Sequence, residues 1–210
     1  MRVLIGCEYS GRVRRAFAER GHEVYSCDLL PADDYDGKHL VADALDVIYS
    51  YPWDLIIAHP PCTYLTNSAE WAYGDGPYHQ NVKPDTLVGW ERRRAREEAI
   101  KFWFRIWKAN CPKICIENPV GTISQYVKPT QYIQPYEYGE DASKKTCLWL
   151  KGLPPLKPTK YVEPRIVDGK KRWGNQTDSG QNKMTPSDSR GHDRSLTPQG
   201  WADAMSEQWG

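Results

Sequence analysis

One cysteine of this chain stands where a reactive thiol is expected. Cys62 follows two prolines, and the prolines follow an apolar run at residues 53–58 that predicts a buried strand. Because proline fixes φ and lacks an N–H group, the thiol should lie on a stiff loop at the carboxyl end of that strand. Most cysteines are inert packing residues, whereas a nucleophile must be accessible. The position of Cys62 favours the nucleophile.

A carboxyl group ends the next predicted strand. Glu117 and Asn118 follow the apolar residues 113–116, and we expect this strand to be the neighbour of the one before Cys62. A carboxyl group at this point can hydrogen-bond or protonate a ring nitrogen, and Asn118 can anchor the loop. Asp28, Asp43 and His59 also follow predicted strands. Such residues are common turn formers, but a series at one sheet edge favours a ligand crevice.

The elements that must hold these residues alternate between strand and helix. This alternation predicts an α/β fold with a doubly wound, mostly parallel sheet. Residues 62–84 are polar, rich in glycine and aromatic, and predict a long loop of the kind found at active sites. The strands are expected at residues 3–7, 23–27, 39–42, 53–58, 113–116 and 146–150, and the helices at 11–20, 44–50, 85–110 and 197–209.

Length and composition set the outer limits. The chain has 210 residues, 40% of them hydrophobic, and a net charge of +1, which predicts one domain with a small insertion. The sequence has no apolar run near the ~20 residues of a membrane span and no signal-peptide pattern at its start. We therefore expect a cytoplasmic protein with reduced cysteines and without a membrane or metal site.

The near-neutral total conceals a basic segment. Residues 151–194 contain ten basic and five acidic residues, so the rest of the chain is acidic. Trp173 directly follows three consecutive basic residues, Lys170, Lys171 and Arg172. Basic groups beside an exposed aromatic ring suit nucleic acid, and an ordinary solvated loop is equally compatible. The sequence thus divides into a core at 1–150, a basic segment at 151–194 and a final helix at 195–210 that packs back on the core.

The order of these motifs resembles the DNA cytosine-5 methyltransferases, and more narrowly their short phage-type members. The resemblance covers residues 1–150 and the last helix. It rests on a glycine turn after the first strand, an acid after the second, Pro-Pro-Cys after the fourth and Glu-Asn after the fifth. It implies a Rossmann-like fold that binds S-adenosylmethionine, with a small irregular basic insertion, and a place in the host-cell cytoplasm if a phage encodes it.

The resemblance also implies roles for particular residues. Cys62 would attack carbon 6 of a flipped cytosine, and Glu117 would hold and protonate ring nitrogen 3, with Asn118 in the same catalytic set. The segment Lys144-Lys145-Thr146 is the nearest basic substitute for a missing Gln-x-Arg-x-Arg motif, and Lys145 is the candidate taken from it. Asp28 would bind the ribose of the cofactor and Asp43 its adenine. The remaining cofactor contacts would be Glu8, Tyr9, Ser10, Gly11, Leu29, Ala44, His59 and Pro60, and the DNA contacts would be Thr63, Lys170, Lys171, Arg172 and Trp173.

The sequence departs from that family pattern, and alternatives stay open. Thr63 replaces the usual Gln, Pro119 the usual Val, and the recognition segment is short. The partner could be duplex DNA, a single strand or a cytosine nucleotide. His59-Pro60-Pro61 also resembles the motif of amino methyltransferases that act on cytosine N4 or adenine N6. A catalytically degenerate DNA-binding protein is the third alternative.

Overall fold

The computed structural model describes residues 1–34, 37–78, 82, 84–184 and 190–210. Its centre is a seven-stranded sheet in the order β3-β2-β1-β4-β5-β7-β6. The strands are β1 (Arg2–Gly6), β2 (Glu23–Asp28), β3 (His39–Val41), β4 (Leu55–Ala58), β5 (Lys113–Pro119), β6 (Gln131–Ile133) and β7 (Thr146–Lys151). The helices are α1 (Arg12–Ala18), α2 (Ala44–Ser50), α3 (Gly89–Trp107), α4 (Ile123–Tyr126), α5 (Arg190–Ser195) and α6 (Gln199–Trp209).

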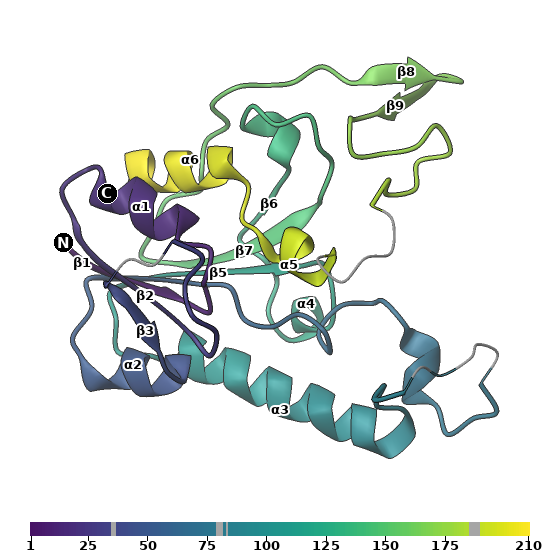
Figure 1. Ribbon diagram of the computed structural model, residues 1–210, viewed down its shortest axis with the longest axis horizontal. Helices are drawn as coiled ribbons and strands as arrows, with labels where there is room; N and C mark the ends of the chain where they lie inside the picture. Colours follow the sequence, from purple (N-terminus) through teal and green to yellow (C-terminus); the bar gives the residue numbers. More distant parts are fainter. Residues whose placement is uncertain (35–36, 79–81, 83, 185–189) are drawn as a thin grey trace.

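The sheet is mostly parallel and has helices on both faces. Strands β3, β2, β1, β4 and β5 run parallel, and β7 runs antiparallel to both β5 and β6. Helices α1 and α6 cover one face, and α2 and α3 cover the other (Figure 1). The predicted fold class, a doubly wound and mostly parallel α/β sheet, is therefore confirmed. The antiparallel direction of β7 is a feature that the sequence pattern does not reveal.

The alternation of side chains along β5 explains the two faces. Ile114 and Ile116 belong to the core under α2 and α3, whereas Cys115 belongs to the core under α1 and α6. Strands buried on both faces are apolar throughout, as parallel strands in α/β proteins generally are. Trp103 of α3 and Trp149 of β7 meet edge to face with ring centroids 5.2 Å apart. Much of the aromatic content of the chain is thus core.

The long elements are as predicted, and the short ones were missed. Helix α2 has its predicted bounds, and α3 lies inside the predicted 85–110. Strands β2 and β5 extend beyond the prediction, so Asp28 and Glu117 belong to the strand ends themselves. Elements of only a few residues give too short a pattern to recognise. They are α4, α5, β6, two 3-10 turns at Glu70–Tyr73 (η1) and Pro135–Glu137 (η2), and the ribbon of β8 (Arg165–Val167) and β9 (Lys170–Arg172).

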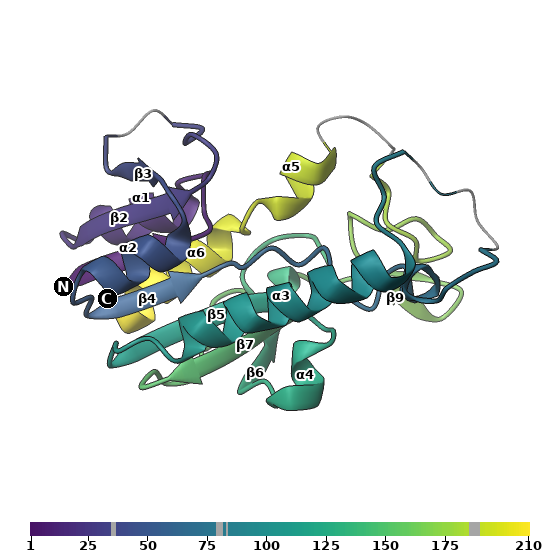
Figure 2. The ribbon, with the colours of Figure 1, turned by 90° about the horizontal axis from the view of Figure 1, so that it is seen from below.

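The segment after β4 is held against the first half of α3. The guanidinium of Arg96 lies 3.4 Å from the ring centre of Tyr73 and pairs with Glu70 at 2.6 Å. Arg93 donates to the carbonyl of Tyr73 at 2.6 Å. The described part of the predicted long loop is therefore built on α3, and it extends past the carboxyl edge of the sheet (Figure 2). No helix of the described residues is long and apolar enough to cross a membrane.

Candidate active site

The ends of β4 and β5 bring the predicted reactive residues together. Ala58 pairs with Ile116 in the parallel register, so the next residues along each strand also lie side by side. The Nδ1 atom of His59 is 3.2 Å from Oε2 of Glu117. Asn118 donates from Nδ2 to the carbonyl of Pro60 at 2.8 Å. The prediction that these two strands are neighbours is therefore confirmed.

Glu117 is an ionised group in a largely buried place, with 13% of its side chain exposed. Burial alone raises the pKa of this carboxyl. The hydrogen bond with His59 and the charge of Lys144, helped by the Thr146 hydroxyl, outweigh that effect and lower the pKa below its usual value. The cluster is thus a buried carboxylate held in its charged form by polar neighbours.

Lys144, and not the predicted Lys145, is the lysine whose charge acts on Glu117. The Nζ atom of Lys145 lies over the ring of Tyr132 at 4.3 Å, on the other side of the strand. Side chains alternate across an extended chain, so Lys144 and Thr146 share the side of Glu117, and Lys145 does not. The alternation could have identified Lys144 if the pairing of β7 with β5 had been known.

Two buried polar atoms of this cluster have no hydrogen-bond partner among the described residues. They are Nε2 of His59 and Oδ1 of Asn118. Buried polar atoms in native proteins are nearly always hydrogen-bonded, so such orphans mark where a ligand or water completes the site. Both orphans lie on residues that touch the loop carrying Cys62.

The Cys62 loop is fastened from the side of β5. Its first point of attachment is the bond from Asn118 to Pro60. The second is the amide of Thr122, which donates to the carbonyl of Leu65 at 2.8 Å. Gly121 permits this approach, because a Cβ atom there would lie 1.9 Å from the Leu65 oxygen. The half-buried Cys62 therefore stands on a loop held at both ends, as the two prolines predicted.

The other cysteines have the properties of packing residues. Burial is the largest cause of a raised thiol pKa at each of them: Cys7, Cys27, Cys111, Cys115 and Cys147. A thiol with a raised pKa stays protonated and is a poor nucleophile at neutral pH. These five residues are therefore internal controls for any reaction assigned to Cys62.

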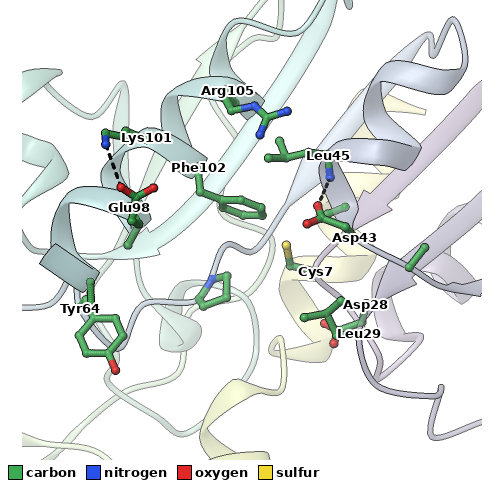
Figure 3. Close-up of a pocket in the computed structure, with 15 residues that line it drawn as sticks. Cys7, Asp28, Leu29, Asp43, Leu45, Tyr64, Glu98, Lys101, Phe102 and Arg105 are labelled. Carbon is green, nitrogen blue, oxygen red and sulfur yellow. Dashed lines mark hydrogen bonds and ion pairs between the residues drawn. The ribbon is translucent and has the colours of Figure 1, made fainter. Parts of the chain in front are cut away.

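A cavity of about 700 Å³ lies at the carboxyl edge of the sheet (Figure 3). Pro61, the residue before Cys62, belongs to its lining. The cavity lies between the ends of β1 and β2, the start of α2 and one side of α3. Four residues of the predicted cofactor site line it: Asp28, Leu29, Asp43 and Ala44. Residues that the sequence reasoning missed also line it, and they include Cys7, Pro61, Tyr64, Ala95, Ala99 and Phe102.

The residues of α3 that line the cavity follow a spacing that can be recognised in the sequence. Ala95 and Ala99 are four residues apart, so they lie on one side of the helix, and Phe102 follows three residues later. Two small side chains make room for a ligand, and the aromatic ring supplies a flat apolar surface. Figure 3 shows the ring of Phe102 reaching from α3 toward Cys7 and Asp43.

The two aspartates that line the cavity also accept hydrogen bonds from backbone amides two residues further along the chain. Asp43 caps α2 by accepting from the amide of Leu45 at 2.7 Å. Asp28 accepts from the amide of Leu30 at 3.0 Å. The turn-forming role and the cavity-lining role therefore occur in the same residues. These bonds fix the orientation of the carboxylates and place them at the cavity.

The turn after β1, which was predicted to contact the cofactor, is not among the residues that line this cavity. Glu8 is buried and accepts at Oε1 from the amide of Val13 at 2.8 Å, at the start of α1. A carboxylate there is stabilised by the helix dipole. Tyr9 pairs its hydroxyl with Ser195 at 2.6 Å, and Ser10 donates to Glu8 at 3.2 Å. The other predicted contacts outside the cavity lining are Gly11, His59 and Pro60.

The predicted DNA contacts occupy different environments. Thr63 is exposed beside Cys62, and Lys170 and Lys171 are exposed on β9. Trp173 is only 8% exposed, so the expectation of an exposed ring is wrong. Its ring stacks on Tyr136 at 4.1 Å with an angle of 12°. Trp173 anchors the basic segment to the core because a large ring gains more from packing than from solvent.

The structure gives no sign of a metal centre in the part of the chain it describes. No group of three or more His, Cys, Asp or Glu side chains there could hold a metal ion. Residues 185–189 of the basic segment lie outside the described residues.

No protein-family model matches this chain, and no characterised protein sequence is significantly similar to it. Solved structures are similar to it at low identity. A prophage-encoded protein of E. coli described as a DNA modification methyltransferase aligns with 80% of this chain and 56% of its own, at 13% identity and a TM-score of 0.43. A triple variant of DNMT2 from Spodoptera frugiperda aligns with 81% of this chain and 57% of its own length, at 17% identity and a TM-score of 0.43.

An rRNA methylase from Escherichia coli aligns with 71% of this chain and 55% of its own, at 15% identity and a TM-score of 0.35. This chain thus spans little more than half the length of these three structures. The likenesses are too distant to assign a function, which has to come from the site itself.

Proposed function

We propose that this chain is an S-adenosylmethionine-dependent methyltransferase that methylates carbon 5 of cytosine in DNA, with Cys62 as its nucleophile. One observation carries the proposal. The register of β4 and β5 sets the Cys62 loop against Glu117, at the sheet edge that also borders the cavity. Glu117 contacts His59 and Asn118 contacts Pro60, so the carboxylate lies against the segment that leads to Cys62. A thiol and an ionised carboxylate are the groups that this chemistry requires.

The cavity suits S-adenosylmethionine in size and in lining. A volume of about 700 Å³ lies within the usual range for small-molecule sites. Asp28 would accept hydrogen bonds from ribose hydroxyls, Asp43 from the adenine amino group, and Phe102 would pack against the adenine ring. When bound, the cofactor supplies an electrophilic methyl group.

Cys62 and Glu117 would make cytosine reactive. Carbon 5 of the ring is a poor nucleophile, and adding the Cys62 thiolate to carbon 6 transfers electron density to it. Glu117 would hold ring nitrogen 3, which gains a proton as the carbon–sulfur bond forms. After methylation, a base takes the carbon-5 proton, the carbon–sulfur bond breaks and returns the thiolate, and nitrogen 3 gives its proton back to Glu117. The base must leave the stack to be reached.

The proton on nitrogen 3 has to be delivered to the site. Because the pKa of Glu117 is lowered, its carboxylate is ionised at neutral pH before the base enters. His59 is the adjacent group, bonded to Glu117 through Nδ1. We assign His59 the role of positioning Glu117 through this bond, and the proton comes from solvent as the base enters.

The amino-methyltransferase alternative fits the geometry less well. In that chemistry the proline backbone holds the exocyclic amine of the base. Here the Pro60 carbonyl accepts from Asn118 at 2.8 Å, and His59 bonds to Glu117. The His-Pro-Pro segment thus already contacts Glu117 and Asn118, which favours the cysteine chemistry.

The proposal is tested by the product. The chain is incubated with methyl-labelled S-adenosylmethionine and, in parallel, with duplex DNA, single-stranded DNA, RNA or a cytosine nucleotide. The acceptor is then digested to nucleosides. We expect the label in 5-methylcytosine. Label in N4-methylcytosine or N6-methyladenine would overturn the chemistry, and DNA binding without label in any acceptor would indicate a degenerate binding protein.

A further inference from the structure

A two-stranded ribbon, β8–β9, stands apart from the main sheet. Arg165 pairs with Arg172, Ile166 with Lys171 and Val167 with Lys170. The turn between the strands has Asp168 at φ 48° and Gly169 at φ 71°, the positive values of the tight turns that suit a twisted hairpin. The ribbon lies at the end of the molecule where the segment after β4 also extends (Figures 1 and 2).

One face of the ribbon is braced by the loop that follows it. Arg165 forms an ion pair with Asp178 and donates to the carbonyl of Gln176 at 2.5 Å. Arg172 donates from Nε to the carbonyl of Asp178 at 3.0 Å. The loop is itself anchored through the buried ring of Trp173. Two arginines that face each other across the strands would otherwise repel, and these contacts hold the ribbon in one shape.

The other face is presented to solvent. Ile166 has 63% of its surface exposed, and Lys171, directly opposite it, is exposed as well. An apolar side chain next to a lysine, on a braced ribbon, contributes little to the packing of the fold. The exposed pair of Ile166 and Lys171 is therefore placed to contact a binding partner.

We propose that this ribbon enters the major groove of duplex DNA, with Ile166 against base edges and Lys171 on a phosphate. Four of the six strand residues are basic: Arg165, Lys170, Lys171 and Arg172. Asp178 neutralises Arg165, and the positive charge of the other three complements a phosphate backbone. The major groove of B-form DNA admits a two-stranded ribbon, and apolar side chains there contact thymine methyl groups. The narrow major groove of A-form RNA does not admit side chains in this way.

This inference takes one point from the proposed function, which is that the methyl acceptor is a nucleic acid. It adds the form of that acceptor, double-stranded DNA, and the element that contacts it. It also replaces Trp173, which the structure buries, with Ile166 as the non-polar contact. The short basic segment would then read little sequence directly, because few side chains reach base edges.

The experiment measures binding by the full chain without cofactor. Fluorescence anisotropy gives the Kd for labelled duplex DNA, single-stranded DNA and double-stranded RNA between about 50 and 200 mM salt. The variants are Ile166→Ser and Lys171→Gln. The control is Lys108→Gln, an exposed lysine at the far end of α3. Thermal melting establishes that each variant is folded.

The two variants should change different quantities. Lys171→Gln should weaken duplex binding and reduce the slope of log Kd against log salt by about one. Ile166→Ser should weaken duplex binding by about tenfold and leave the slope unchanged, because it removes apolar contact and not charge. Both should affect duplex DNA more than the other two nucleic acids, and Lys108→Gln should leave all three affinities unchanged.

Three results would overturn the inference. The first is no binding of duplex DNA by the unmodified chain, and the second is binding by both ribbon variants equal to that of the unmodified chain. The third is an equal loss for all three nucleic acids, which would make the ribbon a general phosphate surface. Because the assay contains no cofactor, its outcome is independent of methyl transfer, and failure of the proposed function would appear only in the labelling experiment.

Discussion

The carboxyl edge of the sheet has two parts of opposite character. Beside β1 and β2 the side chains surround an open cavity, and Asp28 and Asp43 are fixed there by their own turns. Beside β4 and β5 the polar side chains bond to one another and to the loop that carries Cys62. An open, mostly apolar space with a few fixed polar groups binds a ligand, whereas a packed polar cluster with a shifted pKa is typical of a reaction site. The two parts should therefore respond differently to mutation.

The largest effect is expected in the polar cluster, from Glu117→Gln. A neutral amide cannot pass a proton to ring nitrogen 3, so methyl transfer should fall by about 100-fold or more. The affinity for S-adenosylmethionine should stay unchanged, because Glu117 does not line the cavity. Single-turnover rates and calorimetric titration measure the two quantities separately. Equal losses in both would assign Glu117 a structural role and remove the distinction between the two parts.

The opposite result, a loss of cofactor affinity with the rate retained, is expected from Phe102→Ala in the cavity. Loss of an aromatic wall should weaken binding of S-adenosylmethionine by about tenfold, in proportion to the apolar contact removed. At saturating cofactor the rate should recover, because Cys62 and Glu117 are unchanged. An unaltered affinity would show that the cofactor does not occupy this cavity.

The smallest effect is expected in the pH dependence of the rate, when two adjacent lysines are replaced in turn. Lys144→Met removes a charge that lowers the pKa of Glu117, so that pKa should rise. Lys145→Met is the matched control, because Lys145 lies over Tyr132. The pH–rate profile should move to higher pH on its acid side in the first variant alone. A shift of equal size in both would contradict the assignment of Lys144.

The same pair has a defined effect on stability. The folded-state pKa of Glu117 lies below the value of about 4.5 in an unfolded chain. The ionised group therefore contributes stability that is present above about pH 4.5 and is lost as the pH falls through the folded-state pKa. Acid unfolding followed by circular dichroism should begin at higher pH in Lys144→Met than in Lys145→Met.

The sequence predicted what depends on local pattern and missed what depends on pairing between distant segments. The apolar runs located the parallel strands, and the acids at their ends led to Asp28, Asp43 and Glu117. The choice between Lys144 and Lys145 required the antiparallel pairing of β7 with β5, which no local pattern encodes. The burial of Trp173 required its partner Tyr136, 37 positions earlier in the chain.

Glu8 shows a second kind of competition that the sequence pattern does not reveal. A carboxylate in the first turn was expected to contact the cofactor, but four residues later the start of α1 offers it unpaired amides. Val13 supplies one of them, and the carboxylate turns toward the helix. A competing local partner of this kind decides the orientation of a side chain, and the pattern of residue types does not distinguish the two outcomes.

The most direct test of the central claim is covalent trapping on DNA containing 5-fluorocytosine. Fluorine at carbon 5 cannot leave as a proton does, so the bond from the thiol to carbon 6 persists after methyl transfer. We predict an adduct that depends on S-adenosylmethionine and that peptide mass spectrometry locates at Cys62. It should be absent from Cys62→Ser and retained in Cys7→Ser, whose cysteine lines the cavity with a raised pKa. Methylation of ordinary DNA without an adduct, or an adduct on another cysteine, would contradict the proposed mechanism.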